Sequence, residues 1–229
     1  MGRLLLYFDE TLEQTYQTLL DRPTMRKRSP LLNWTPKIYS KLAKNYDLLA
    51  PIFLSIGEKA KKRVGLEFIS GNVLDVACGT GALLKMAHDA GLQCYGNDLS
   101  EGMIAEAKKK LPHAEFRVAS FYDLPYPNNT FDYVVETNAV SGVVIEADKV
   151  LLEMLRVCKP GGQILIGDYC KAPKETPWTR FMAWIGMLIG DFPHDFQSIF
   201  RELGCQPEVE YLGWSGMYQF IKVKKNDQS

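Results

Sequence analysis

The residues with the clearest chemical meaning lie in one short segment. Its sequence is Val73-Leu74-Asp75-Val76-Ala77-Cys78-Gly79-Thr80-Gly81, an apolar strand with a carboxylate near its end and two glycines before a helix. In an open α/β sheet, ligands bind at the carboxyl ends of the strands, near the topological switch point. Two glycines allow a tight turn and a close approach of the backbone to a ligand. The segment therefore predicts a small-molecule site at the end of a strand.

Two kinds of ligand use such a loop. A dinucleotide places its pyrophosphate on the helix N-terminus and usually requires a third glycine. Gly79 and Gly81 match the first two glycines, but Leu84 stands at the third position. The carboxylate of Asp75 would repel an anionic pyrophosphate and attract a cationic ligand. An NAD-dependent reductase is therefore a weak alternative.

The elements around this loop alternate regularly. Short apolar strands are expected at 72–76, 94–97, 115–119, 131–136 and 163–167, with helices at 81–90, 100–111 and 146–158 between them. This alternation predicts a parallel sheet covered on both faces. A helical run over 36–64 precedes it, with Pro51 expected to break the helix.

The pattern changes after residue 168. Helices are expected at 178–189 and 193–203, followed by a terminal antiparallel pair at 208–212 and 217–223. We therefore predict an α/β fold with a Rossmann-like, doubly wound, seven-stranded sheet, mostly parallel with an antiparallel C-terminal strand. Helices cover both faces, and extra helices precede the sheet at the N-terminus.

Residues 73–81 resemble the first motif of the class I S-adenosylmethionine (SAM)-dependent methyltransferases. The resemblance covers residues 37–170 well and the remainder loosely. It implies that S-adenosyl-L-methionine is the cofactor and that the loop backbone, with Ala77, Gly79 and Gly81, lies beside its amino-acid part. The acid that orients the ammonium group in this family, often through water, matches Asp75.

A second carboxylate follows the second strand, in Gly96-Asn97-Asp98-Leu99-Ser100. A carboxylate at this position can accept both ribose hydroxyls, and Asp98 is the only acid at this strand end. Capping of the next helix is the alternative role for Asp98, but Ser100 already supplies an N-cap. Leu99 and Met103 are expected beside the cofactor, although core packing is an equal alternative for Met103.

Residues 119–127 resemble the family segment that reads the adenine edge. The family often has Asp where this chain has Ser120, which is shorter and uncharged but can still accept a hydrogen bond. The backbone N–H of Phe121 is a second candidate contact. After the fourth strand, Glu136 and Thr137 are further candidate cofactor contacts, with hydrogen bonding inside the loop as the alternative.

The acceptor is less determined by the sequence. None of the three histidines belongs to an obvious catalytic dyad, which favours a mechanism by proximity. His194 is the histidine closest to the expected acceptor pocket. Tyr39 and Tyr46, in the N-terminal helices that cover SAM in related enzymes, are the other candidate catalytic residues.

The helix at 178–189 is apolar on nearly all sides. Such a helix is buried in a core, forms a wall for an apolar acceptor, or docks on a membrane, and it is too short to span a bilayer. It falls where class I methyltransferases commonly insert acceptor-binding elements. Together with residues 45–57 it resembles the bacterial phosphatidylethanolamine N-methyltransferases and the ubiquinone/menaquinone C-methyltransferases, and looks closer to the first group.

We therefore expect methyl transfer to an apolar or lipid acceptor, first the head-group amine of a phospholipid. C-methylation of a prenylated quinone precursor is second, and methylation of a soluble small molecule is third. A SAM-binding protein without catalysis is the alternative of a different class. Residues 1–64 are expected to form an N-terminal helical cap over the cofactor, and residues 65–229 the methyltransferase domain, with an acceptor-side insertion at about 171–204.

The composition of the chain bears on its partners and its cellular location. Lys and Arg together number 27, and Asp and Glu also number 27, which argues against a dedicated nucleic-acid partner. Five scattered cysteines without a C-x-x-C pair indicate reduced, buried thiols and no metal site. No signal peptide or membrane span is visible, so we expect a cytoplasmic protein with possible peripheral contact to the inner face of the membrane. The basic stretch at 21–30 and the cluster at 59–63 would suit anionic lipid.

Overall fold

The computed structural model describes residues 30–53, 55–143, 146–189 and 193–226. Almost all of the basic stretch at 21–30 and residues 190–192 lie outside these ranges. No helix in the described ranges is long and apolar enough to cross a membrane. All five cysteines are buried and free of disulfides.

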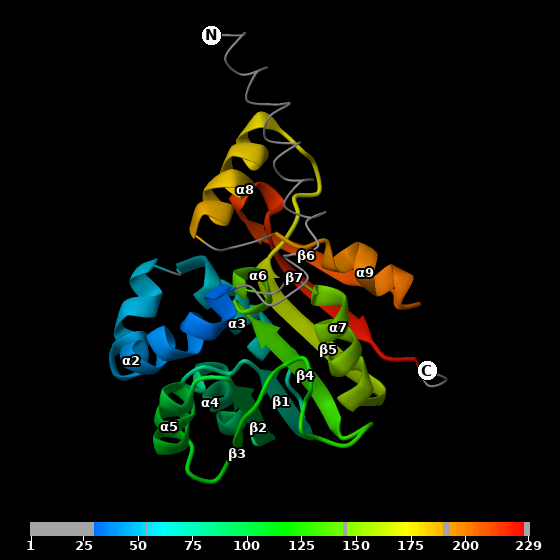
Figure 1. The fold of residues 1–229 in the computed structure, drawn as a ribbon. Helices are drawn as coiled ribbons and strands as arrows, with labels where there is room; N and C mark the ends of the chain where they lie inside the picture. Colours follow the sequence, from blue (N-terminus) through cyan, green and yellow to red (C-terminus); the bar gives the residue numbers. More distant parts are fainter. Residues whose placement is uncertain (1–29, 54, 144–145, 190–192, 227–229) are drawn as a thin grey trace.

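Seven strands form one sheet in the order β3-β2-β1-β4-β5-β7-β6 (Figure 1). Their bounds are β1 Asn72–Val76, β2 Gln93–Asp98, β3 Glu115–Val118, β4 Phe131–Thr137, β5 Cys158–Tyr169, β6 Glu208–Gly213 and β7 Tyr218–Lys224. The first five strands are parallel, and β7 is antiparallel to both of its neighbours. The predicted doubly wound, mostly parallel sheet with an antiparallel C-terminal strand is confirmed.

Helices cover both faces of the sheet. The described helices are α2 Pro30–Phe53, α3 Ser55–Gly65, α4 Ala82–Asp89, α5 Glu101–Lys110, α6 Val140–Val143, α7 Ala147–Val157, α8 Pro177–Ile189 and α9 Phe196–Glu202. One core cluster joins apolar side chains of α3, α4 and α5 to one face, and a second joins α7 and α9 to the other. In Figure 1, α2 and α8 lie beyond the carboxyl ends of the central parallel strands.

Local sequence explains where several of these helices begin and end. The Ser100 hydroxyl accepts a hydrogen bond from Met103 N at 3.2 Å and caps α5, as predicted. Gly91 follows α4 with a φ of +85°, the left-handed conformation expected of a glycine after a helix. These caps fix the helices that flank β1 and β2 and thereby the loops between them.

Three predicted element starts were wrong by three or more residues. α2 begins before residue 36 and continues through Pro51 to Phe53, because a proline near a helix end removes only one backbone donor. β5 begins at Cys158 rather than at 163, and the backbone groups of Gly161 and Gly162 bond to Lys225, which extends the edge of the sheet. α9 begins at Phe196 because the Asp195 side chain caps it.

Candidate functional site

The glycine loop between β1 and α4 adopts a backbone that few residues tolerate. Ala77, Gly79 and Gly81 have φ values of +62°, +53° and +76°. The loop is tied to its neighbours, because Cys78 N donates to the carbonyl oxygen of Asn97 at 2.9 Å. A Cβ on Gly79 would meet no atom within 4 Å, so the space beside this glycine is open. The loop therefore leaves its backbone open at Gly79.

Asp75 lies behind this loop with an unsatisfied carboxylate. It is 2% exposed, and its Oδ1 has no hydrogen-bond partner within the described ranges. Burial, assisted by the charge of Asp98, raises the pKa of Asp75 to about 8, while the ammonium of Lys61 acts in the opposite direction. A buried carboxylate oxygen without a donor is costly, and a cationic ligand would satisfy it. This residue fits the ammonium group of the expected cofactor.

Asp98 ends β2 and faces the same loop. Its Oδ2 accepts from Gly79 N at 2.9 Å and its Oδ1 accepts from Ser100 N at 2.8 Å. Burial raises the pKa of Asp98, while these backbone donors lower it. Each carboxylate oxygen has a second lone pair, so Asp98 can still accept two hydroxyl groups. The pair Asp75 and Asp98 thus suits a ligand with a cation at one end and a diol further along.

A contact that the sequence did not predict joins α2 to the glycine loop. The Thr80 hydroxyl donates to Asp47 Oδ1 at 2.5 Å, and Lys110 Nζ lies 2.7 Å from Asp47 Oδ2 and 3.2 Å from the Thr80 oxygen. Burial would raise the pKa of Asp47, but the hydrogen bonds from Lys110 and Thr80 outweigh it and lower the pKa. We call Asp47, Thr80 and Lys110 the loop clasp. These three residues are far apart in the chain, so no local sequence pattern predicts the loop clasp.

The two candidate tyrosines of α2 lie against each other. The rings of Tyr39 and Tyr46 are 6.0 Å apart in an edge-to-face arrangement. Burial, then Tyr39 and the charge of Asp98, raise the pKa of Tyr46 well above its ordinary value. Tyr46 therefore stays protonated near neutral pH and can donate a hydrogen bond but is a poor base. Asp98, the residue expected to hold the ribose, is one of the charges that act on Tyr46.

Four further predicted cofactor contacts, Leu99, Met103, Ser120 and Phe121, come from the segments that follow β2 and β3. Ala119 N donates to the Asp98 carbonyl oxygen at 3.1 Å, which places the start of the expected adenine segment beside β2. The Ser120 hydroxyl accepts from Tyr122 N at 3.2 Å within its own turn. Leu99 is half-buried, and Phe121 and Met103 are buried.

Glu136 lies on the opposite face of the sheet from Asp75. Val76 is in register with both Asn97 and Glu136, so these three side chains share the face covered by α7. Glu136 Oε1 accepts from Ala139 N at 2.7 Å and from Val140 N at 3.1 Å. Its contacts hold the loop after β4.

Thr137 is next in the strand, so it faces the Asp75 side and is half-buried. Its methyl group would lie 3.4 Å from a Cβ on Gly167 of β5, beside Ala60 of α3. Asn138 follows with a φ of +59°, a conformation that Asn tolerates better than most residues. The end of β4 thus turns sharply under α3.

His194 lies just beyond the carboxyl end of β5. Its carbonyl oxygen accepts from Lys171 N at 2.9 Å, and its ring centroid is 5.7 Å from that of Phe196. The neighbouring helix α8 exposes a row of aromatic rings. Trp178 is 58% exposed and Phe181 44% exposed, and Phe181 stacks on Trp184 at 6.1 Å.

Comparisons with known proteins give the family of this chain. The family model described as a methyltransferase domain matches residues 74–166. A demethylmenaquinone methyltransferase of Paenarthrobacter aurescens is 30% identical over 206 residues, which cover 84% of this chain and 79% of that protein. Phosphoethanolamine N-methyltransferase 3 of Arabidopsis thaliana is 35% identical over 165 residues, which cover 68% of this chain and 32% of that protein. The solved complex of DhpI with SAH, 22% identical, covers 83% of this chain and 95% of its own, with a TM-score of 0.63.

Proposed function

This chain belongs to the SAM-dependent methyltransferases, and from that premise we propose that it methylates an apolar or lipid acceptor, first the head-group amine of a phospholipid. SAM is its cofactor and supplies an activated methyl group on a sulfonium. The chain therefore has to bind, orient and shield the reactants rather than activate the methyl donor.

The residues assigned to the cofactor divide by chemistry. Asp75 would hold the ammonium group, Asp98 the ribose hydroxyls, and the glycine-loop backbone the amino-acid part. The unsatisfied oxygen of Asp75 and the open space beside Gly79 support this assignment. The further assigned contacts are Ala77, Gly81, Leu99, Met103, Ser120, Phe121 and Thr137. Glu136 is left out of this set, because its side chain points to the opposite face of the sheet from Asp75 and holds the loop after β4.

The acceptor side needs no strong base. An amine is methylated in its neutral form, and holding it in line with the methyl group supplies much of the rate. We assign Tyr46, Tyr39 and His194 to shaping and hydrogen bonding at the acceptor. The protonated state of Tyr46 supports a donor role for its hydroxyl.

The surface beyond the carboxyl ends of the strands carries the lipid proposal. On α2, Ile38 is 51% exposed and Leu42 43% exposed, and they lie next to exposed Lys37, Lys41 and Lys44. An exposed helix face that combines aliphatic side chains with lysines suits an anionic membrane surface. Helix α8, which carries the exposed rings of Trp178 and Phe181, lies beyond the same ends of the strands (Figure 1). We assign residues 1–64 to a cap over the cofactor and residues 171–204 to the acceptor side.

A prenylated quinone precursor is the second candidate acceptor. The Paenarthrobacter aurescens relative, which is named demethylmenaquinone methyltransferase and matches 84% of this chain, favours it. A quinone is apolar and would suit the same exposed surface. Methylation at carbon needs removal of a proton from the ring, for which Tyr46 is a poor base.

The acceptor is tested with methyl-labelled SAM and vesicles that contain phosphatidylethanolamine, a prenylated quinol, or neither, with soluble phosphoethanolamine in a fourth reaction. We expect label in the phospholipid. Label in the quinol alone would replace the first candidate with the second, and label in soluble phosphoethanolamine alone would reject a lipid acceptor.

Membrane contact has its own control within the chain. Replacing Ile38 and Leu42 with Ser should reduce sedimentation with anionic vesicles. Replacing Leu66 and Ile69 with Ser removes side chains that are 79% and 78% exposed but precede the amino end of β1, so sedimentation should be unchanged. Equal loss in both variants would contradict the assignment of the surface.

A further inference from the structure

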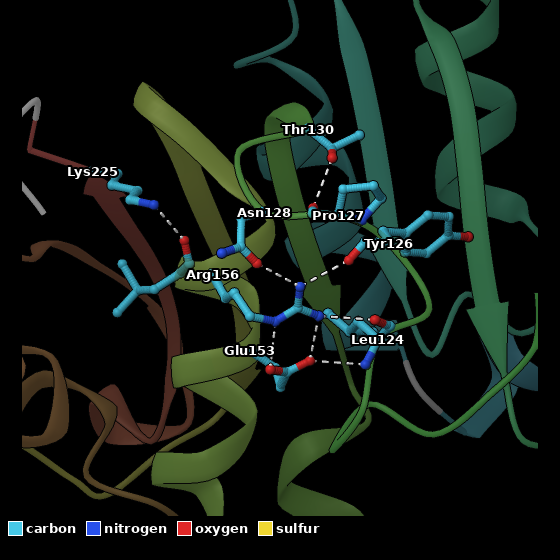
Figure 2. A network of polar contacts seen from close by, with 9 residues as sticks. Leu124, Tyr126, Pro127, Asn128, Thr130, Glu153, Arg156 and Lys225 are labelled. Carbon is cyan, nitrogen blue, oxygen red and sulfur yellow. Dashed lines mark hydrogen bonds and ion pairs between the residues drawn. The ribbon is translucent and has the colours of Figure 1, made fainter.

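The segment that joins β3 to β4 carries the expected adenine contacts but has no helix or strand of its own. Residues 119–130 form turns, so their buried backbone groups need partners from elsewhere. Figure 2 shows that these partners come from the C-terminal part of α7.

Arg156 makes most of these contacts. Its guanidinium donates to the carbonyl oxygen of Leu124 at 2.8 Å, to that of Tyr126 at 2.8 Å, and to Oδ1 of Asn128 at 2.9 Å. Glu153 accepts from Arg156 Nε and Nη2 at 2.7 Å each, and its Oε2 also accepts from Leu124 N at 2.9 Å. Leu124 is thus held through both its N–H and its C=O. A planar guanidinium with fixed donors can make this set of bonds, and a lysine ammonium cannot.

The end of α7 adds two more bonds to the same segment. Asn129 N donates to the carbonyl oxygen of Arg156 at 3.0 Å, and Thr130 N donates to that of Val157 at 2.8 Å. The last carbonyls of a helix have no partner within the helix, so these bonds satisfy both elements. The segment is therefore fixed at one end by α7 and at the other by the bond from Ala119 to Asp98 of β2.

The fixed residues lie close to the adenine contacts. Leu124 and Tyr126 are buried in the same core cluster as Phe121. Between them, Asp123 N donates to the Ser120 carbonyl oxygen at 3.4 Å in a single turn. A shift of Leu124 would therefore move Ser120 and Phe121 as well.

We propose that Arg156 and Glu153 are a positioning pair that sets the affinity of the site for the adenine end of the cofactor. They act through the backbone of Leu124 and Tyr126 and do not themselves touch the ligand. This inference rests on the assignment of Ser120 and Phe121 to adenine. It predicts a selective loss: the adenine contacts weaken while the ammonium and ribose contacts at Asp75 and Asp98 remain.

The test compares two ligands that differ in the adenine alone, S-adenosylhomocysteine and S-ribosylhomocysteine, by calorimetry. The variants are Arg156→Gln, Arg156→Lys and Glu153→Gln. We expect each to weaken binding of the adenosyl compound about tenfold, the loss when a hydrogen bond to adenine is misaligned. Binding of the ribosyl compound should change by less than about twofold. If Arg156→Gln does not fold, the two conservative variants still give the comparison.

Lys225→Met is the matched control. Lys225 is 7% exposed and donates to Asn129 Oδ1 at 2.9 Å and to the carbonyl oxygens of Leu155 and Cys158 at 2.9 and 3.0 Å. This substitution disturbs the same helix end without touching residues 120–126. It should lower the melting temperature and leave the ratio of the two affinities as in the wild type.

Three results would overturn the proposal: equal weakening of both ligands in the Arg156 variants, wild-type affinity for the adenosyl compound, or the same change of ratio in Lys225→Met. Neither ligand needs a methyl acceptor, so an error in the proposed acceptor would not affect the outcome. A wild-type protein that binds both ligands equally would contradict the adenine assignment itself and this proposal with it.

Discussion

Replacing Asp75 with Asn should stabilise the cofactor-free protein while weakening its cofactor site. The pKa of Asp75 is about 8 against an ordinary value of 3.8, because burial opposes its ionisation. At ~1.4 kcal/mol for each pH unit between the two values, the free energy of unfolding is lower above about pH 8 by up to roughly 6 kcal/mol. Asn has nearly the same shape and no charge, so it avoids this cost.

The sign of the pH dependence follows from proton linkage. Between about pH 4 and about pH 8 the folded protein keeps a proton on Asp75 that the unfolded chain has released. The free energy of unfolding of the wild type therefore falls as the pH rises through this window. Asp75→Asn removes the dependence, so its advantage over the wild type should be near zero at about pH 4 and largest above about pH 8.

The assay is urea unfolding of both proteins without cofactor across this range. Asp132→Asn is the control with the opposite sign. Burial alone would raise the pKa of Asp132, but donors from Asn72 and Lys159 lower it, so that substitution should destabilise at neutral pH and lose its effect in acid. A difference between Asp75→Asn and the wild type that does not change with pH would refute the reasoning.

Cofactor binding should release the proton that Asp75 holds in the cofactor-free protein. A cationic amino group beside Asp75 favours its ionised form, so binding releases a proton and the affinity should rise with pH. We expect about a tenfold gain for each unit between roughly pH 6 and pH 7.5, below the pKa of the amino group itself. Asp75→Asn should bind weakly and without this slope in calorimetry. A wild-type affinity that is flat over this range would contradict the raised pKa.

Three further outcomes follow from the geometry. Asp47→Asn and Lys110→Met should each weaken SAM binding several-fold, because each breaks the loop clasp. The double variant should lose no more SAM affinity than either single variant. Additive losses of affinity in a double-mutant cycle would argue against coupling of the two residues. Gly96→Ala should lower the free energy of unfolding in urea by about 1–3 kcal/mol, because the new Cβ would lie 2.8 Å from Cys78 Sγ and 3.0 Å from Leu84. An unchanged urea midpoint would show that the core around Gly96 can relax. Tyr46→Phe should lower the rate of methyl transfer but leave the shape of its pH dependence unchanged below about pH 9, because the phenol stays protonated in this range. If the variant loses a rise of the rate with pH that the wild type shows, Tyr46 acts as a base.

Patterns within a few residues of the sequence were sufficient to predict the helices and strands around the glycine loop. β1 was predicted with its observed bounds because it is a short apolar run that ends at glycines. The cap at Ser100 was predicted because it acts within one turn of its own helix. Asp75 and Asp98 were selected because both lie near the carboxyl ends of strands predicted to be parallel, and their contacts with the cofactor stay a prediction.

What could not be predicted depends on contacts between distant residues. Asp47 and Lys110 are 63 positions apart, and only the packing of α2 on α5 brings them together. The spacing of Glu153 and Arg156 suggests a helical ion pair, but not that both would bond the backbone around Leu124. The face of Glu136 depends on strand register, which a sequence pattern does not specify.

The position of β7 has a consequence for the order of events in synthesis. β7 lies between β5 and β6, and it is the last of these three strands in the chain. On the ribosome, residues 208–213 of β6 therefore emerge before the strand that joins them to the sheet. Until residues 218–224 have emerged, β5 and β6 both present open edges, and such edges are templates for pairing with other chains. A nascent chain that pauses between these two strands should be especially dependent on chaperones.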